Sequence, residues 1–505
     1  MRSKKAFLNI ITNLLLELVV IIYGFIVPKL IMKSFGSNVN GLISSITQFL
    51  GYITLLESGF GPVVKATLYK PIAQKNKKEI ANILKASERF FRKISYIFII
   101  YIVLLSLAYP LLINKDFDYI YTLSLIVIIS LGTFAEFYFG MTYRLYLQAE
   151  QSKYIISILQ IITYIINIVL IVLLVRLKMS IHIIKLLTGL IFIIRPIWQN
   201  WYVKKKYSIN LNDADDNYKI KNKWDGLAQH IAAVIHSNTD ITLLTLFCDL
   251  LEVSVYSVYY LVVSGVRKLI NSFTGGIDAL FGNMLANKEK NNLNNKFNMY
   301  EVIYLSITTI LFTSTIILIV PFVMVYTKGI TDVNYVRYTF GYLIVISEYI
   351  WAIRLPYSSI TLAAGHFKET RTGAWIEAIS NIMISCILII KYGIIGVAIG
   401  TIVAMAIRTV EFIYHSNKYI LNRSMWISIK KILLVFFESL IIIFICNNLH
   451  YLENTNYLNW IINSIIVTSI SATIVLFINY CLFKEEFKKI YIIIKQVLKR
   501  KKNAQ

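Results

Sequence analysis

The chain has few charged residues and few cysteines for its length. Only 15% of its 505 residues are Asp, Glu, Lys or Arg, whereas 57% are hydrophobic. A soluble domain carries about 25% charged residues, so this composition excludes a soluble globular protein. The four cysteines have neither CxxC nor metal-ligand spacing, which argues against a zinc site and predicts buried free thiols.

The chain also lacks the motifs of common catalytic sites. It contains no GxxxxGK[ST] nucleotide-binding loop, no HExxH zinc motif and no GxSxG nucleophile motif. No polar segment is long enough for a nucleotide-binding domain or for the catalytic loop of a sugar polymerase. The sequence therefore predicts a protein that is not an enzyme, with no catalytic residues, no metal site and no cofactor.

Long apolar runs are what the sequence has in abundance. An apolar run of about 18 residues or more can span the roughly 30 Å hydrocarbon core of a membrane. The first run is too long for the apolar part of a signal peptide, and no small-residue cleavage site follows it. We therefore expect an all-α integral membrane protein with about fourteen transmembrane helices. The runs are 8–32, 40–68, 93–113, 119–142, 154–175, 180–202, 227–247, 253–284, 300–326, 335–362, 372–390, 393–414, 429–447 and 457–482.

Basic residues outnumber acidic ones, 51 to 27, and give a net charge of +24. In a soluble protein this excess of positive charge would suggest binding to nucleic acid. Here the basic residues lie in the breaks between apolar runs, so we expect membrane lipids and no nucleic acid as partners. Every second break is rich in Lys and Arg, around 70–92, 144–153, 204–223, 288–296, 368–371 and 418–431. The positive-inside rule places these breaks in the cytoplasm, and with them both termini, in a bacterial cytoplasmic membrane.

The longest polar break divides the helices into two sets of six. Two sets that start on the same side predict parallel repeats, related by a pseudo-two-fold axis along the membrane normal, around a central cavity. We expect an N-terminal lobe at 1–203, a cytoplasmic linker at 204–226 and a C-terminal lobe at 227–414. Two extra helices follow at 415–483, and a basic amphipathic tail at 484–505 should lie on the inner leaflet.

Polar residues recur every three or four positions along the eighth run. This spacing places them on one helical face, which lipid cannot cover. We expect this face to border the cavity, although burial against neighbouring helices with neutralised charges is the alternative. The residues are Ser264, Arg267, Lys268, Asn271, Gly275, Asp278 and Gly282.

Other ionisable residues lie within apolar runs, where a charge costs about 2.5–3.5 kcal/mol and needs a partner or water. Lys29 and Arg354 are candidates for contact with substrate, although basic residues near helix ends can also reach the membrane surface. Glu17, Glu57 and Asp240 are candidates for ion coupling or charge pairing. Basic residues inside a cavity favour an anionic substrate, because Arg and Lys both suit phosphate.

Several short segments resemble one known family. They are Gly36–Leu42, Ser45–Leu50, Glu57–Gly61, Leu68–Pro71, Gln148–Gln151, Tyr256–Tyr260, Ala364–Lys368, Glu377–Asn381 and Gly393–Val397. In this order and spacing they resemble bacterial polysaccharide flippases of the Wzx-like kind, in the multidrug/oligosaccharidyl-lipid/polysaccharide superfamily. The break expected at Gly59-Phe60-Gly61-Pro62 lies within one of these segments.

The resemblance implies two six-helix lobes around a V-shaped cavity and a flippase for undecaprenyl-pyrophosphate-linked oligosaccharide repeat units. By position, Arg267, Lys268 and Lys29 would hold the pyrophosphate. A polysaccharide polymerase and other proteins of the same biosynthetic gene cluster would be partners. The alternatives are a cation-coupled multidrug exporter of the same superfamily and, less well supported, a membrane-embedded polysaccharide polymerase.

Overall fold

The computed structural model describes residues 2–57, 59–113, 116–209, 211, 214–215, 217–220, 238–274, 277–287, 289–449 and 456–489. Within these ranges every regular element is a helix and no strand occurs, which confirms the predicted all-helical fold class. The chain divides into two compact units, Met1–Ser254 and Val255–Gln505, each described by itself below. Part of the predicted linker lies outside the described residues, as do residues 490–505 of the predicted tail.

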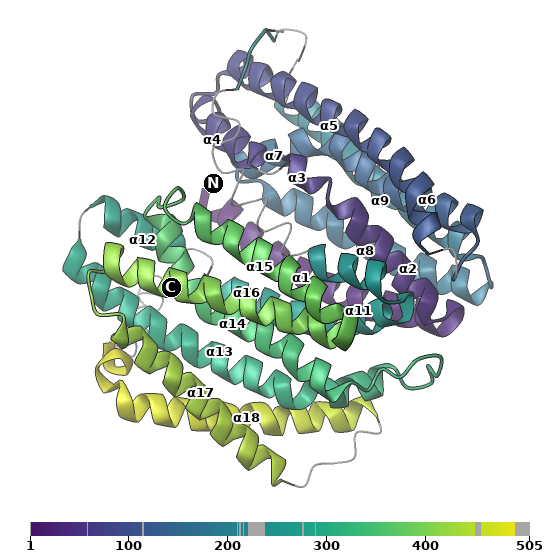
Figure 1. Ribbon diagram of the computed structural model, residues 1–505. Coiled ribbons are helices and arrows are strands. Elements are labelled where there is room, and N and C mark those ends of the chain that lie inside the picture. Colours follow the sequence, from purple (N-terminus) through teal and green to yellow (C-terminus); the bar gives the residue numbers. More distant parts are fainter. Residues whose placement is uncertain are drawn as a thin grey trace. The chain divides into compact units, whose positions relative to one another are not determined.

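The first unit is built from long helices around one apolar core. α1 packs along α8, α5 along α6, and α6 along α9 (Figure 1). Fully buried side chains such as Leu42, Ile46, Phe98 and Leu125 form the core of this bundle. The elements are α1 (Arg2–Phe35), α2 (Ser37–Gly51), α3 (Thr54–Glu57), α4 (Phe60–Ala73), α5 (Lys77–Leu112), α6 (Tyr119–Ala135), the π-helix η1 (Glu136–Gly140), α7 (Met141–Ala149), α8 (Lys153–Arg176) and α9 (Ile181–Tyr207).

The second apolar run is interrupted, as its glycines and proline predict. Instead of one helix over 40–68, the chain forms α2, α3 and α4 in succession. Gly59, which precedes α4, has a φ of 93°, a conformation that favours glycine over residues with a side chain. The break predicted at this position is confirmed, and a further interruption follows Gly51.

The second unit continues from α11, within which the division between the units falls. α14 and α15 pack against α16, whereas α17 and α18 pack against α13 (Figure 1). The predicted eighth helix over 253–284 is described as α11 up to Thr274 and α12 from Ile277, and the two residues between them lie outside the described residues. The elements are α11 (Leu250–Thr274), α12 (Ile277–Ala286), α13 (Lys290–Tyr326), α14 (Tyr338–Ala363), α15 (Arg371–Tyr392), α16 (Ile394–His415), the π-helix η3 (Ser416–Ile420), α17 (Trp426–Asn447) and α18 (Tyr457–Leu482).

Two glycines bring α16 unusually close to α15. A Cβ atom built on Gly396 would lie 2.5 Å from the backbone carbonyl of Leu388, and one built on Gly400 would overlap Ser385. Gly396 and Gly400 form a GxxxG pattern, which lets two membrane helices approach backbone to backbone. The close approach matters because α15 and α16 carry charged residues of the candidate site.

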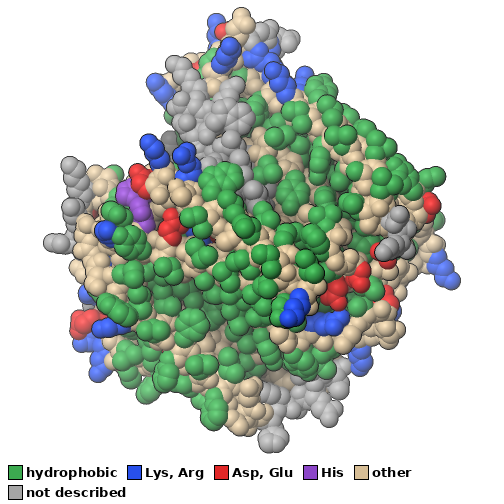
Figure 2. Space-filling model, viewed as in Figure 1, with side chains coloured by type: hydrophobic (Ala, Val, Ile, Leu, Met, Phe, Trp, Pro, Cys, Tyr) green, Lys and Arg blue, Asp and Glu red, His purple; other side chains and the backbone are tan. Residues whose placement is uncertain are grey.

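The outer surfaces of the helices are apolar. Ile390 and Phe444, for example, are 80% and 71% exposed. On the face seen in Figure 2, hydrophobic side chains cover the sides of the helices and many of the Lys and Arg side chains gather near helix ends. Exposing so many apolar side chains to water would be energetically unfavourable, whereas contact with lipid is not. The chain is therefore a multi-pass membrane protein.

Eleven described helices are long and apolar enough to cross a membrane. Two more of the fourteen predicted spans are helices that carry more polar or charged residues. α14 contains Glu348 and Arg354, and every 18-residue window of α17 contains Lys430, Lys431 and Glu438. The remaining predicted span, 227–247, lies largely outside the described residues, and its part from 238 to 247 is helical.

Candidate functional site

An ion pair joins α11 and α14 in the second unit. Nη1 of Arg267 lies 3.2 Å and 3.4 Å from the two carboxylate oxygens of Glu348. The guanidinium carbon also lies 4.0 Å from the ring centre of Trp351, one turn from Glu348 on α14. The Arg267 side chain remains 23% exposed, whereas that of Glu348 is 7% exposed. Trp351 and Glu348 together therefore hold the guanidinium in place while part of it stays accessible.

A second group of charges joins α14, α15 and α16. Arg354 donates to Glu377 at 2.7 Å, and Arg408 lies 3.4 Å from the other oxygen of the same carboxylate. Arg408 also pairs with Glu411 and donates to the backbone carbonyl of Thr370 at 2.8 Å. Arg408 is almost fully buried, so its role is to hold the three helices together.

The two groups lie close to each other along α14. Glu348 experiences the positive charge of Arg354 as well as that of Arg267. The six residues of the two groups are together called the arginine network: Arg267, Glu348, Arg354, Glu377, Arg408 and Glu411. Isolated charges at this depth would be costly, and their mutual pairing removes most of that cost. Of the three arginines, Arg267 has the largest exposed fraction, so it is the one best placed to meet a ligand.

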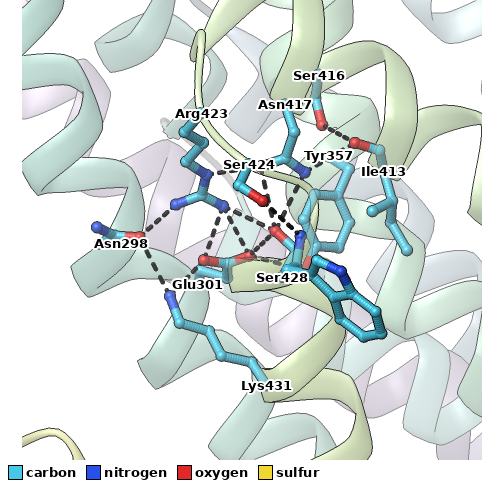
Figure 3. Close-up of polar contacts among 11 residues, drawn as sticks. Asn298, Glu301, Tyr357, Ile413, Ser416, Asn417, Arg423, Ser424, Ser428 and Lys431 are labelled. Carbon is cyan, nitrogen blue, oxygen red and sulfur yellow. Dashed lines mark hydrogen bonds and ion pairs between the residues drawn. The ribbon is translucent and has the colours of Figure 1, made fainter.

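A further buried cluster surrounds Glu301, whose side chain is completely inaccessible (Figure 3). Its carboxylate lies 3.0 Å from Nη2 of Arg423 and also pairs with Lys431 at 2.5 Å. The hydroxyls of Tyr357 and Ser428 donate to it at 2.8 Å and 2.7 Å. Two cations, one carboxylate and two hydroxyls satisfy one another here, so this cluster fixes α13, α14 and α17 together and its carboxylate is not accessible to a ligand.

The first unit has a smaller charged group at the π-helix η1. Glu136 pairs with Arg144 at 2.9 Å, and both lie within electrostatic reach of Glu57. π-helical turns inside longer helices are frequent at functional sites. A Cβ atom on Gly140 would lie 2.5 Å from Cβ of Pro196, so η1 packs tightly on α9.

The predicted site residues are distributed over both units. Arg267 and Arg354 both belong to the arginine network, where each pairs with a different carboxylate. The polar face predicted for the eighth run stays a prediction beyond α11, since the side chain of Asp278, on α12, lies outside the described residues. The other predicted residues differ in exposure, and each has a contact within the chain. Asp240 is buried, Asn271 is exposed, and the partly buried ones are Lys268, Lys29, Glu17 and Glu57.

Sequence reasoning missed the Glu301 cluster. Arg423 and Lys431 were assigned to a cytoplasmic break, although both side chains are buried in contact with Glu301. The available signal was Glu301 itself, an acidic residue at the start of the apolar run 300–326. Such a residue needs a cationic partner, but the sequence does not say that the partner comes from a segment more than 100 residues later.

No family model and no curated protein matches the sequence. Among solved structures, the lipid II flippase MurJ in an inward closed conformation is similar, with a TM-score of 0.66, 18% identity, and coverage of 93% of this chain and 99% of MurJ. An inward-facing multidrug resistance MATE transporter of the MOP superfamily has a TM-score of 0.62 and 12% identity, with 81% and 97% covered.

The MATE multidrug transporter DinF-BH, solved as a complex, has a TM-score of 0.55 and 14% identity, with 82% of this chain and 95% of that chain covered. These similarities extend over most of each chain, although the identities are low. The similarities therefore show how the helices are arranged and do not identify the substrate. The chain has the transporter fold shared by these MurJ and MATE proteins of the MOP superfamily.

Proposed function

We propose that this protein is a flippase that moves a lipid-linked oligosaccharide, carried on a polyprenyl pyrophosphate, from the inner to the outer leaflet of the bacterial cytoplasmic membrane. The observation that carries the proposal is the geometry of Arg267. A single nitrogen, Nη1, makes both contacts with Glu348. Among the described residues, Nε and Nη2 of Arg267 have no hydrogen-bond partner, so the guanidinium keeps donors for a second anion.

Pyrophosphate suits such a partly engaged guanidinium. Arginine binds phosphate oxygens with two parallel N–H groups, and Nε with Nη2 supplies that pair. Trp351 keeps the guanidinium in place while Nη1 contacts Glu348 and the other donors are left for phosphate. Because Glu348 also lies within electrostatic reach of Arg354, its carboxylate has another cation to compensate it when Arg267 shares its charge with the substrate.

Two similarities support a lipid-linked substrate over other anions. The structurally similar MurJ is a flippase that acts on lipid II. The sequence segments quoted above resemble polysaccharide flippases over the first twelve predicted spans. Transport outward of a negative charge gains about 2.3 kcal/mol per charge per 100 mV from an inside-negative potential, so the potential can drive export in this direction.

The test is export of surface polysaccharide in cells whose only copy of the protein carries Arg267→Glu. Charge reversal removes the phosphate donor and adds a repulsive carboxylate, so we expect surface polysaccharide to be lost while the protein remains in the membrane. Arg267→Lys keeps a cation and should retain part of the export. Normal export by the Arg267→Glu protein at wild-type abundance would contradict the proposal.

A multidrug exporter is the second candidate, because two of the similar structures are MATE transporters. Buried carboxylates such as Glu348 and Glu377 are groups that an organic cation would seek. Both are paired with arginines, however, which makes them poor cation sites in this conformation. A deletion strain that keeps its surface polysaccharide but becomes sensitive to cationic drugs would favour this candidate.

A further inference from the structure

A cavity of about 490 Å³ lies in the first unit, between residues 86–96 of α5, Phe60 of α4 and residues 217–220. Its walls combine aromatic rings, including Phe90 and Tyr96 of α5, with four cationic side chains. Arg89, Arg92 and Lys93 come from α5 and Lys219 from the segment that follows α9. None of the described residues that line it is acidic, so this part of the lining is cationic.

Hydrogen bonds hold the second wall against α5. Arg89 donates to the backbone carbonyl of Tyr218 at 2.9 Å, and Lys85 donates to that of Ala214 at 3.3 Å. Asn82 accepts from the backbone N–H of Asp215 at 2.7 Å. These three residues of α5 are three and four positions apart and share one helical face, so residues 214, 215 and 218 lie along that face.

The cations of the cavity are unequally engaged. Arg89 is used in the contact with Tyr218, and Arg92 lies 3.6 Å from Glu88 and 5.4 Å from the ring centre of Tyr138. Glu88 in turn accepts from the Tyr143 hydroxyl at 2.5 Å. Within the described part of the chain, the ammonium groups of Lys93 and Lys219 have no hydrogen-bond or ion-pair partner. These two lysines, one from each wall, remain for an external anion.

The position of the cavity along α5 indicates the depth at which that anion lies. The predicted apolar run begins at residue 93, so Arg89, Arg92 and Lys93 stand where the helix enters the hydrocarbon. Tyr96 and Tyr218 border the cavity at the same level, and tyrosine is enriched at the interface between lipid and water. Basic pockets of this kind at the cytoplasmic surface suit lipid headgroups that carry phosphate.

We propose that this cavity binds a phosphate group at the membrane surface, held by Lys93 and Lys219 with Arg92 beside them. Its volume falls within the range of about 300–1,000 Å³ that is usual for ligand sites, so it accommodates more than a bare phosphate. The phosphate belongs to the headgroup of an anionic phospholipid or is a free anion from the cytoplasm. In either case its bridge between the two lysines fastens residues 217–220 to α5.

The experiment measures lipid binding to the purified full-length protein by native mass spectrometry, with phosphatidylglycerol or phosphatidylcholine added. The variant is Lys93→Gln/Lys219→Gln, and the control is Lys368→Gln/Lys430→Gln, which removes the same charge from exposed lysines far from the cavity in sequence. A third arm adds inorganic phosphate to the protein with phosphatidylglycerol. All four lysines of these variants are exposed, so folding should be retained in both.

We expect the first phosphatidylglycerol to bind about tenfold more tightly than phosphatidylcholine, and this preference to be lost in the Lys93/Lys219 variant but not in the control. Displacement by millimolar inorganic phosphate would identify a free anion as the source, and persistence of the lipid would identify the headgroup. Equal binding of the two lipids by the wild-type protein with no bound inorganic phosphate, or equal behaviour of variant and control, would overturn the proposal. Export of polysaccharide is not part of this readout, so the two proposals fail independently.

Discussion

Arg267 meets Glu348 through one nitrogen only, with Nη1 lying 3.2 Å and 3.4 Å from the two carboxylate oxygens. A side-by-side arrangement would instead engage two nitrogens and saturate the planar fork of the guanidinium. The observed geometry neutralises the charge of Arg267 within the helices and leaves its other donors for a ligand. This relationship underlies both the proposed function and the first prediction.

Arg267→Gln alone should destabilise the protein, because it leaves the carboxylate of Glu348 without its nearest cation. Removal of one partner of a buried ion pair costs about 3–5 kcal/mol, whereas removal of both can be nearly neutral. The double variant Arg267→Gln/Glu348→Gln should therefore recover most of the thermal stability in detergent and still fail to export polysaccharide. If the double variant exports normally, the pair has only a structural role.

Glu301→Ala should unfold the second unit more readily than any surface change. The substitution leaves Arg423 and Lys431 buried without their carboxylate, which costs about 3–5 kcal/mol. Glu485→Gln is the matched control, because that side chain is 72% exposed and its nearest cation lies at 3.8 Å. A melting temperature of the Glu301→Ala protein equal to that of the control would show that the cluster contributes little to stability.

Gly396→Ala should separate α15 from α16. Its Cβ atom would meet the backbone of Leu388, which cannot move aside as a flexible side chain would. Overpacking of this kind costs about 1–3 kcal/mol and should also lengthen the contacts between Arg408 and Glu377. Gly265→Ala on α11 is the control, because a Cβ atom there meets nothing within 4 Å and alanine favours the helix. Equal thermal stability of the two variants would refute the close packing.

Cys248 provides a pH-dependent probe of the break after residue 247. Burial, with smaller effects of Glu252 and Asp249, raises the pKa of its thiol to about 11. The reactive thiolate is therefore scarce at neutral pH, and the rate of maleimide labelling should rise about tenfold per unit from pH 7 to pH 10. The measurement uses a protein with Cys386, Cys446 and Cys481 replaced by serine. A rate that levels off near pH 9 would indicate an ordinary, exposed thiol.

The labelling of Cys248 also tests the orientation of the chain. The predicted topology places this break on the outer side of the membrane. A membrane-impermeant maleimide added to intact cells at pH 9 should therefore label Cys248. Labelling only after the cells are opened would contradict the assignment of the termini to the cytoplasm.

Amino-acid composition and apolar run length were sufficient to predict the helical membrane fold. The interruption at Gly59 was also predictable, because its cause is local to the sequence. The chain partners of Arg267 and Arg354 were not, although Glu348 and Glu377 are acidic residues within the apolar runs 335–362 and 372–390. Pairing depends on which helix faces come together. The two pairs are separated by 81 and 23 positions in the sequence, and nothing in the sequence indicates that they are in contact.

The second half of the polar face on the eighth run remains a prediction. Helical periodicity identifies residues that would share a face if the helix continued from Arg267 to Asp278. Gly275 and Gly276, which lie between α11 and α12, are outside the described residues, and two adjacent glycines weaken a helix by about 1 kcal/mol each. Periodicity alone therefore does not fix whether Arg267 and Asp278 share a face.

The most direct test of the account is binding of a polyprenyl-pyrophosphate-linked oligosaccharide to the purified protein in lipid nanodiscs, compared with the same lipid lacking its phosphates. The account predicts that the wild-type protein prefers the pyrophosphate form by at least about tenfold, and that Arg267→Gln/Glu348→Gln loses this preference while it stays folded. Equal affinity of the folded double variant and the wild-type protein for the pyrophosphate form would contradict the account.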